Sequence, residues 1–260
     1  MKTVRIIPLV LLVFILLSGC ANTSRVNITT EIDNAVSNAI LTHNKDSFYE
    51  GECQAEGHVI FDAKKTDDRI IFYSYIGYSE YGFENGNFVD ISGISCPAVI
   101  ILDNNYSLIE IQYPEDGSYY GKSIKKMFPK SCVNDVLNLS DKNEKSINEQ
   151  QKEYAKSYLK SIGREATVGT MSDFEYPLLT DMGVSVDVSN RMDYYILKNE
   201  DYPYWIGNKE LIENGIRYVY QMDYNKSENK IIYTKYEYEN PNNIIEKIIV
   251  DSLTGKEIKE

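Results

Sequence analysis

Alternating apolar and polar residues constrain the fold of this chain more than any other feature. Five segments have the period of two that a half-buried strand requires. They are residues 53–61, 69–78, 87–91, 97–102 and 106–113. Turn-forming residues separate several of them, at 64–68, 84–87 and 103–105. Because a parallel crossover needs a dozen or more residues, connections this short predict an antiparallel meander.

Helical patterns surround this meander. Thr30 and Asp33 resemble a helix start, and Ile32, Val36 and Ile40 follow at fourfold spacing, which predicts a helix over about 31–43. Two shorter helices are expected at 118–128 and 131–137. The longest is expected at 144–162, with Gly163 at its C-terminal cap and a solvated charged face.

The second half of the chain predicts another antiparallel meander. A short strand is expected at 166–169 and a helix at 189–198, before strands at 217–224, 230–238 and 244–251. The fold class is therefore α+β: an N-terminal helix on an antiparallel meander, a helical middle segment and a second meander. We divide it into an N-terminal lobe, 31–140, and a C-terminal lobe, 141–260.

The N-terminus has the layout of a bacterial lipoprotein signal. Lys2 and Arg5 precede an apolar run from Ile6 to Leu17, and Leu17-Ser18-Gly19-Cys20 follows as a lipobox. Residues 1–19 are then a signal peptide, Cys20 is the lipidated first residue of the mature protein, and 20–30 form a polar tether. The alternative is a transmembrane anchor, but a run of 12 residues is short of the ~20 that span a bilayer.

The net charge of the chain limits the classes of partner that it can bind. Removing residues 1–19 takes away Lys2 and Arg5 and no acid, which changes the net charge from −12 to −14. Nucleic-acid binding and polybasic membrane contact both need clustered cations, so the acidic net charge argues against both functions. The 22 tyrosines are typical of half-buried strand faces, with a binding surface as the alternative.

Three cysteines remain after Cys20, namely Cys53, Cys96 and Cys132. An odd number in an exported protein allows at most one disulfide, and Cys53 with Cys96 is the candidate pair because both lie in strand-like segments. No C-x-x-C metal spacing occurs, and no cofactor is expected.

The sequence contains only incomplete matches to known catalytic motifs. Ser123 and Lys126 have the Ser-x-x-Lys spacing of penicillin-recognising enzymes, as do Ser157 and Lys160, but the Lys-Thr-Gly partner motif is absent. We therefore expect no catalytic residues, and a serine–lysine acyl enzyme or beta-lactam-binding protein is the alternative.

Two further clusters merit attention. Glu56 and His58 share one strand face with Glu52 and Gln54, which predicts a polar, solvent-facing stripe, with a metal or proton-sensing pair as the alternative. Nothing downstream supplies an identifiable third ligand, so no metal site is predicted. Trp205 lies in an aromatic segment, 201–207, which indicates either a recognition surface or a loop packed on the core.

Several segments carry a family resemblance. They are residues 51–60, 81–86, 92–93, 113–117, 123–129 and 157–164. Together they resemble the extracytoplasmic C-terminal region of clostridial-type membrane metallopeptidases of the beta-lactam-sensor class. The zinc site of that family lies in a membrane-embedded part absent here, so the resemblance implies a sensor-like or accessory module and transfers no catalytic residue.

The sequence thus predicts a non-enzymatic, lipid-anchored module on the outer face of the cytoplasmic membrane. Its expected partners are the membrane, through the N-terminal lipid, and a protein, peptide or envelope ligand. A structural or immunity-type lipoprotein is a further alternative.

Overall fold

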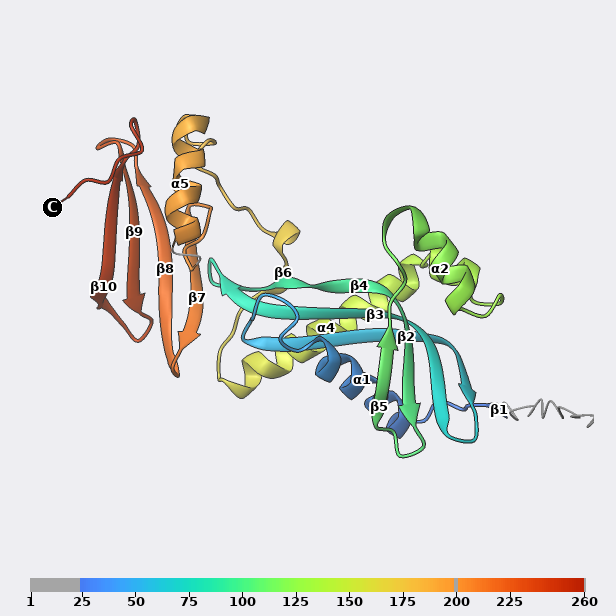
Figure 1. The fold of residues 1–260 in the computed structure, drawn as a ribbon. Helices are drawn as coiled ribbons and strands as arrows, with labels where there is room; N and C mark the ends of the chain where they lie inside the picture. The colour runs from blue at the N-terminus through green and yellow to red at the C-terminus, as the bar shows by residue number, and fades with distance from the viewer. Residues whose placement is uncertain (1–23, 199–200, 260) are drawn as a thin grey trace, which may run out of the picture.

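The computed structural model describes residues 24–198 and 201–259, and no side chains over 193–198 (Figure 1). The predicted signal peptide and Cys20 lie outside the described residues. The fold is α+β, as predicted: helices and antiparallel strands form an N-terminal lobe, and a second antiparallel meander forms the C-terminal lobe at the opposite end of the molecule.

The N-terminal sheet is a meander of long strands. Its strands are β2 (Cys53–Lys65), β3 (Arg69–Glu84), β4 (Asn87–Asp103) and β5 (Leu108–Gln112). The strands predicted at 87–91 and 97–102 are one strand, because residues 92–96 stay paired with β3. Asn85 and Gly86, with φ of 49° and 74°, make the two-residue turn between β3 and β4.

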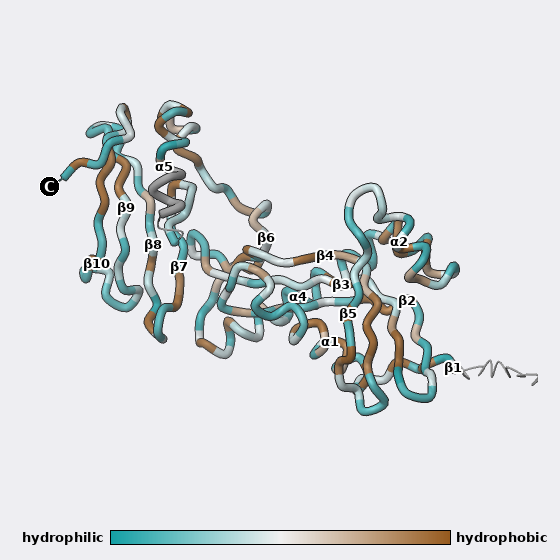
Figure 2. The backbone as a smooth tube through the Cα atoms, viewed as in Figure 1, coloured by the Kyte–Doolittle hydropathy of each residue, from teal (hydrophilic) through white to brown (hydrophobic). Residues whose placement is uncertain are grey.

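Helices cover the two faces of this sheet unequally. Helix α1 (Thr30–Asn44) packs on the face that carries Phe72 and Ile76, and its N-cap is Thr29, one residue before the predicted one. The short helices α2 (Tyr120–Met127) and α3 (Val133–Leu137) cover part of the other face. Figure 2 shows apolar segments of the sheet strands beside α1 and α2.

Helix α4 (Asp141–Ser161) packs on strands β2 and β3 of the N-terminal sheet. Its Ile147 lies against Gly57 and Gly77, and a Cβ at Gly57 would come within 2.3 Å of the Ile147 carbonyl oxygen. The amide of Gln150, expected on the solvated face, instead bonds both the N–H and the carbonyl of His58. Two facing glycines therefore let this helix approach the sheet closely.

The C-terminal lobe contains a four-stranded antiparallel meander and helix α5 (Val186–Lys198). The strands are β7 (Gly207–Glu213), β8 (Ile216–Asn225), β9 (Lys230–Glu237) and β10 (Asn240–Asp251). Strand β7 was not predicted. Met192, Met222 and Tyr233 lie in the core of this lobe. The connection to it includes β6 (Val168–Thr170), which runs parallel to β4, and single 3-10 turns occur at Gly117–Tyr119 and Met171–Asp173.

Two residues of the polar tether predicted at 20–30 lie in a strand. Ser24 and Arg25 form β1, which pairs with Lys65 and Lys64 at the end of β2. Only residues 21–23 separate Cys20 from this strand. Four Cα steps span at most about 14 Å, so a lipid on Cys20 would hold this end of the sheet close to the bilayer surface.

Candidate functional site

The two lobes meet at the turn between β3 and β4. The Asn85 N–H donates to the Asn208 carbonyl at 2.9 Å, and the Asn208 N–H donates to Asn85 Oδ1 at 2.8 Å. Gly207, with φ of 151°, permits this approach, since a Cβ there would lie 2.1 Å from Asn85 Oδ1. Glu84 and Lys209 are paired neighbours across β3 and β7. The sheet therefore continues from one lobe into the other.

Beside this junction lies a small cavity of about 200 Å³, which we call the aromatic pocket. It is formed where β3 and β4 meet the segment 202–211. Its lining comprises Tyr49, Gly82, Phe83, Glu84, Ile91, Tyr202, Pro203, Tyr204, Trp205, Lys209, Glu210 and Leu211. Trp205 is buried and packs edge-on against Tyr176 and Tyr204. The segment 201–207 is thus both packed on the core and part of a cavity wall.

Two buried polar atoms of the aromatic pocket lack a hydrogen-bond partner within the described part of the chain. They are Oε2 of Glu84, whose residue is 7% exposed, and Nε1 of Trp205, which is 3% exposed. Burial raises the pKa of the Glu84 carboxyl to about 7, although the nearby Tyr176 hydroxyl and Lys209 ammonium oppose the rise. The Tyr176 hydroxyl, which is also buried and without a partner at hydrogen-bond distance among the described residues, lies beside the Glu84 carboxyl. Leaving buried polar atoms unpaired costs about 1–3 kcal/mol each, so Glu84 Oε2 and Trp205 Nε1 indicate a site for a ligand or ordered water.

A larger hollow of about 470 Å³ adjoins this pocket and shares five of its lining residues. We call it the acidic groove. Five carboxylates line it, and no lysine or arginine is among its lining residues. These acids are Glu50, Glu52, Asp201, Glu210 and Glu213. The groove therefore presents a negative surface beside an aromatic one.

Two arginines bind two of the carboxylates that line the acidic groove. Arg217 binds Glu52 through two hydrogen bonds and reaches Glu210 at 2.9 Å. Arg164 also binds Glu210, at 2.6 and 3.0 Å, and its guanidinium stacks 3.6 Å from the centre of the Phe83 ring. The side chains of Glu52 and Glu210 are each 6% exposed. This ion network joins β2 to β7 and β8, and so fixes the groove between the lobes.

The stripe predicted to face solvent is buried instead. Glu56 is 2% and His58 is 6% exposed, because α1 packs over them. His58 Nδ1 lies 3.0 Å from Glu56 Oε2, and its Nε2 lies 3.2 Å from Asp33 Oδ1 on α1. Burial lowers the pKa of His58, but the hydrogen bonds and charges of Glu56 and Asp33 outweigh it and raise the pKa above 6.5. Among the described residues, no three His, Cys, Asp or Glu side chains are arranged to hold a metal ion.

The cysteine pair proposed from the sequence is not formed. Cys53 lies opposite Tyr81 and Cys96 opposite Ile76, so the two thiols are on strands flanking β3 and five residues out of register. Two strand spacings alone amount to about 10 Å, beyond the ~7 Å Cα separation that a disulfide allows. Cys53, Cys96 and Cys132 are all free.

Ser123 and Lys126 both lie on α2, but they face different surroundings. The Ser123 hydroxyl is buried, donates to the Tyr120 carbonyl at 2.8 Å and accepts from the Glu115 N–H at 3.0 Å. Lys126 is exposed. The serine therefore ties the helix to the preceding loop.

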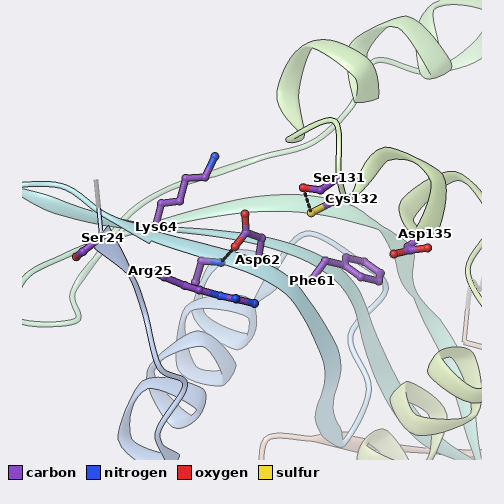
Figure 3. Close-up of a pocket in the computed structure, with 9 residues that line it drawn as sticks. Ser24, Arg25, Phe61, Asp62, Lys64, Ser131, Cys132 and Asp135 are labelled. Carbon is purple, nitrogen blue, oxygen red and sulfur yellow. Dashed lines mark hydrogen bonds between the residues drawn. The ribbon is translucent and has the colours of Figure 1, made fainter. Parts of the chain in front are cut away.

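A third hollow, of about 460 Å³, lies at the opposite end of the sheet (Figure 3). It is lined by residues of β1, β2 and α3 and contains two cations and two carboxylates, namely Arg25, Lys64, Asp62 and Asp135. Figure 3 also shows Cys132 at its edge, with Sγ 3.7 Å from the Ser131 hydroxyl. This hollow lies at the end of the sheet that a lipid on Cys20 would hold near the membrane.

Comparison of the chain with protein-family models, with curated proteins and with solved structures found no match. Within the described residues, no helix is long and apolar enough to cross a membrane.

Proposed function

We propose that this protein is a lipid-anchored extracytoplasmic lipoprotein that binds a protein, peptide or envelope ligand between its two lobes and carries out no catalysis. The observation that carries the proposal is the pair of buried, unpartnered polar atoms, Glu84 Oε2 and Trp205 Nε1, at the aromatic pocket. The resemblance to the extracytoplasmic part of beta-lactam-sensing peptidases is consistent with a sensor-accessory role.

The anchor and the pocket lie at opposite ends of β3. Strand β1 pairs beside the Arg69 end of β3, whereas Glu84, at the other end of the strand, lines the aromatic pocket. Sixteen residues of strand span up to about 50 Å. In a protein moored through Cys20, the groove would therefore be held away from the lipid headgroups and open to an external ligand.

The anchor is tested with Cys20→Ala. Cells expressing the wild type should incorporate radiolabelled palmitate into the protein and retain it with the membrane fraction, whereas the variant should lose both properties. A variant that stays with the membrane, or a wild type that takes up no label, would refute lipidation at Cys20.

Binding is tested with the full-length protein in detergent micelles. The chain has a single tryptophan, so its fluorescence reports on the aromatic pocket directly. A panel of cationic, anionic and neutral peptides and cell-wall saccharides should contain at least one ligand that changes the emission saturably. If none does, the binding function is rejected. Incubation with penicillin followed by intact-mass measurement should show no covalent adduct, and an adduct at Ser123 would establish the acyl-enzyme alternative.

A further inference from the structure

The charges of the acidic groove indicate the class of ligand. Glu52 and Glu210 are paired with Arg217, and Glu213 accepts from Lys235 at 2.8 and 2.9 Å. Glu50 and Asp201 add two more carboxylates at the mouth, one exposed and one half-buried. Because Glu52, Glu210 and Glu213 are neutralised by these cations, Glu50 and Asp201 account for the negative charge of the groove, which favours cations over anions.

The aromatic pocket has the size of a side chain. Its 200 Å³ lies below the ~300–1,000 Å³ of pockets that hold drug-sized molecules. Rings of Tyr49, Tyr202, Tyr204 and Trp205 wall it, and aromatic faces attract alkylammonium groups. The ammonium of Lys209 already lies 5.4 Å from the centre of the Tyr49 ring, which shows that a cation can sit against an aromatic ring at this site.

The two unpartnered atoms define complementary requirements. Glu84 Oε2 can accept a hydrogen bond, and Trp205 Nε1 can only donate one. A ligand that satisfies both must present a donor to Glu84 and an oxygen acceptor to Trp205. An ammonium supplies the donor with a charge that balances the buried carboxylate. A planar guanidinium uses its fork best when it has two acceptors side by side, whereas a single buried oxygen suits a point-like ammonium.

We propose that the aromatic pocket binds the side chain of a lysine presented by a basic peptide segment that lies along the acidic groove. This inference rests on the proposed function and specifies its ligand. The lysine ammonium donates to Glu84 Oε2, its methylene stem packs between the aromatic rings, and a backbone carbonyl of the peptide accepts from Trp205 Nε1. The remaining basic residues of the segment lie near Glu50 and Asp201.

The probe is an acetylated pentapeptide of alternating glycine and lysine, titrated into the full-length protein while Trp205 emission is recorded. The wild type should respond saturably. Acetylating the lysine side chains of the probe keeps the stem and removes the charge, and this peptide should bind at least about tenfold more weakly, because hydrogen bonds to charged groups are the stronger ones. Equal binding of the two peptides, or no response to the lysine peptide, overturns the proposal.

Two variants locate the effect. Glu84→Gln keeps the shape of the side chain and should weaken binding at least about tenfold. Glu228→Gln removes an exposed carboxylate in the turn between β8 and β9 and should change the affinity less than about twofold. Equal losses in both variants would show that only the overall negative charge matters, and would overturn the assignment to the pocket. Trp205→Phe, followed by the anisotropy of a fluorescein-labelled probe, keeps a ring and removes the donor; unchanged affinity would refute the role of Nε1.

The outcome also separates this proposal from the broader one. A neutral saccharide or peptide that changes Trp205 emission while the lysine peptide does not would leave the groove as a binding site and reject its assigned ligand. Silence of the entire panel would reject both.

Discussion

Replacing Glu84 with glutamine should stabilise the protein, and the gain should grow with pH. The carboxyl is buried and lacks a partner for Oε2 among the described residues, so ionisation in the folded state is unfavourable. Burial raises its pKa from 4.5 to about 7, despite the nearby Tyr176 hydroxyl and Lys209 ammonium. Glutamine has the same shape and no charge, and therefore resembles the protonated carboxyl.

The magnitude follows from linkage. In the unfolded chain Glu84 ionises near pH 4.5, whereas in the folded protein it keeps its proton until about pH 7. Below pH 4.5 the Glu84 carboxyl is protonated in both states and costs no stability. As the pH rises from 4.5 through 7, the free energy of unfolding falls, because the unfolded state gains more from ionisation than the folded state does. At about 1.4 kcal/mol per pKa unit, the loss approaches about 3 kcal/mol at pH 8 and is about 1 kcal/mol at pH 5.5.

The assay is urea unfolding of wild type and Glu84→Gln at pH 5.5 and pH 8, followed by Trp205 fluorescence. The variant should be more stable at both, and its advantage should be larger at pH 8 by about 2 kcal/mol. Glu228→Gln is the matched control: this carboxylate is exposed, and its removal should leave the stability nearly unchanged at both pH values. An advantage that is absent at pH 8, or equal at the two pH values, would show that Glu84 is already compensated in the folded protein.

Three further experiments test contacts within the protein. Arg217→Met removes a guanidinium that neutralises buried carboxylates and should lower the free energy of unfolding by about 3 kcal/mol in urea titrations. Adding Glu52→Gln should restore part of this loss, whereas additive losses would contradict the pairing. His58→Gln should be most destabilising below pH 6.5 and less so as the pH rises, because the raised pKa of His58 adds stability that is complete below pH 6.5 and disappears as the folded form deprotonates. Thermal unfolding across pH measures this. Gly57→Ala places a Cβ 2.3 Å from a carbonyl of α4 and should cost at least about 2 kcal/mol, while Gly121→Ala, in open space on α2, should be neutral or stabilising by up to about 1 kcal/mol. Equal melting temperatures for these two glycine variants would refute the close helix–sheet contact.

Local patterns were sufficient to predict most strands, because alternation and turn residues are properties of neighbouring positions. These patterns failed where a contact with residues distant in sequence determines whether a strand forms. Strand β7 (Gly207–Glu213) has little alternation, and its pairing depends on β8 and on Asn85, which is more than 120 residues away. Similarly, β4 passes through Gly93, where a Cβ would lie 2.0 Å from the Tyr78 carbonyl. The prediction left residues 92–96 out of the strands, yet in the sheet Gly93 permits a close approach of backbone.

The candidate site was only partly visible in the sequence. The aromatic segment containing Trp205 was recognised, but Glu84 was assigned to a turn. Its burial depends on Tyr176 and on the segment 202–211, none of which is near it in sequence. Glu56 and His58 were placed on a solvent face for the same reason: polar residues at alternate positions ordinarily face water, and only Asp33 and Tyr154 from two helices make their burial tolerable.

The groove lies where it does because helix α1 is shorter than strand β3, on which it packs. Helix α1 has 15 residues and spans about 22 Å, whereas β3 has 16 residues and spans up to about 50 Å. One helix therefore covers less than half of this face of the sheet. The uncovered part begins beyond Tyr78 and carries Gly82 and Glu84, which the segment 202–211 closes over. Because α1 starts only a few residues after β1, the covered half is also the half next to Cys20. In the lipid-anchored protein that we propose, the same chain order places the anchor at one end of the sheet and leaves the other end to be covered by the segment 202–211, which forms the aromatic pocket beside Glu84.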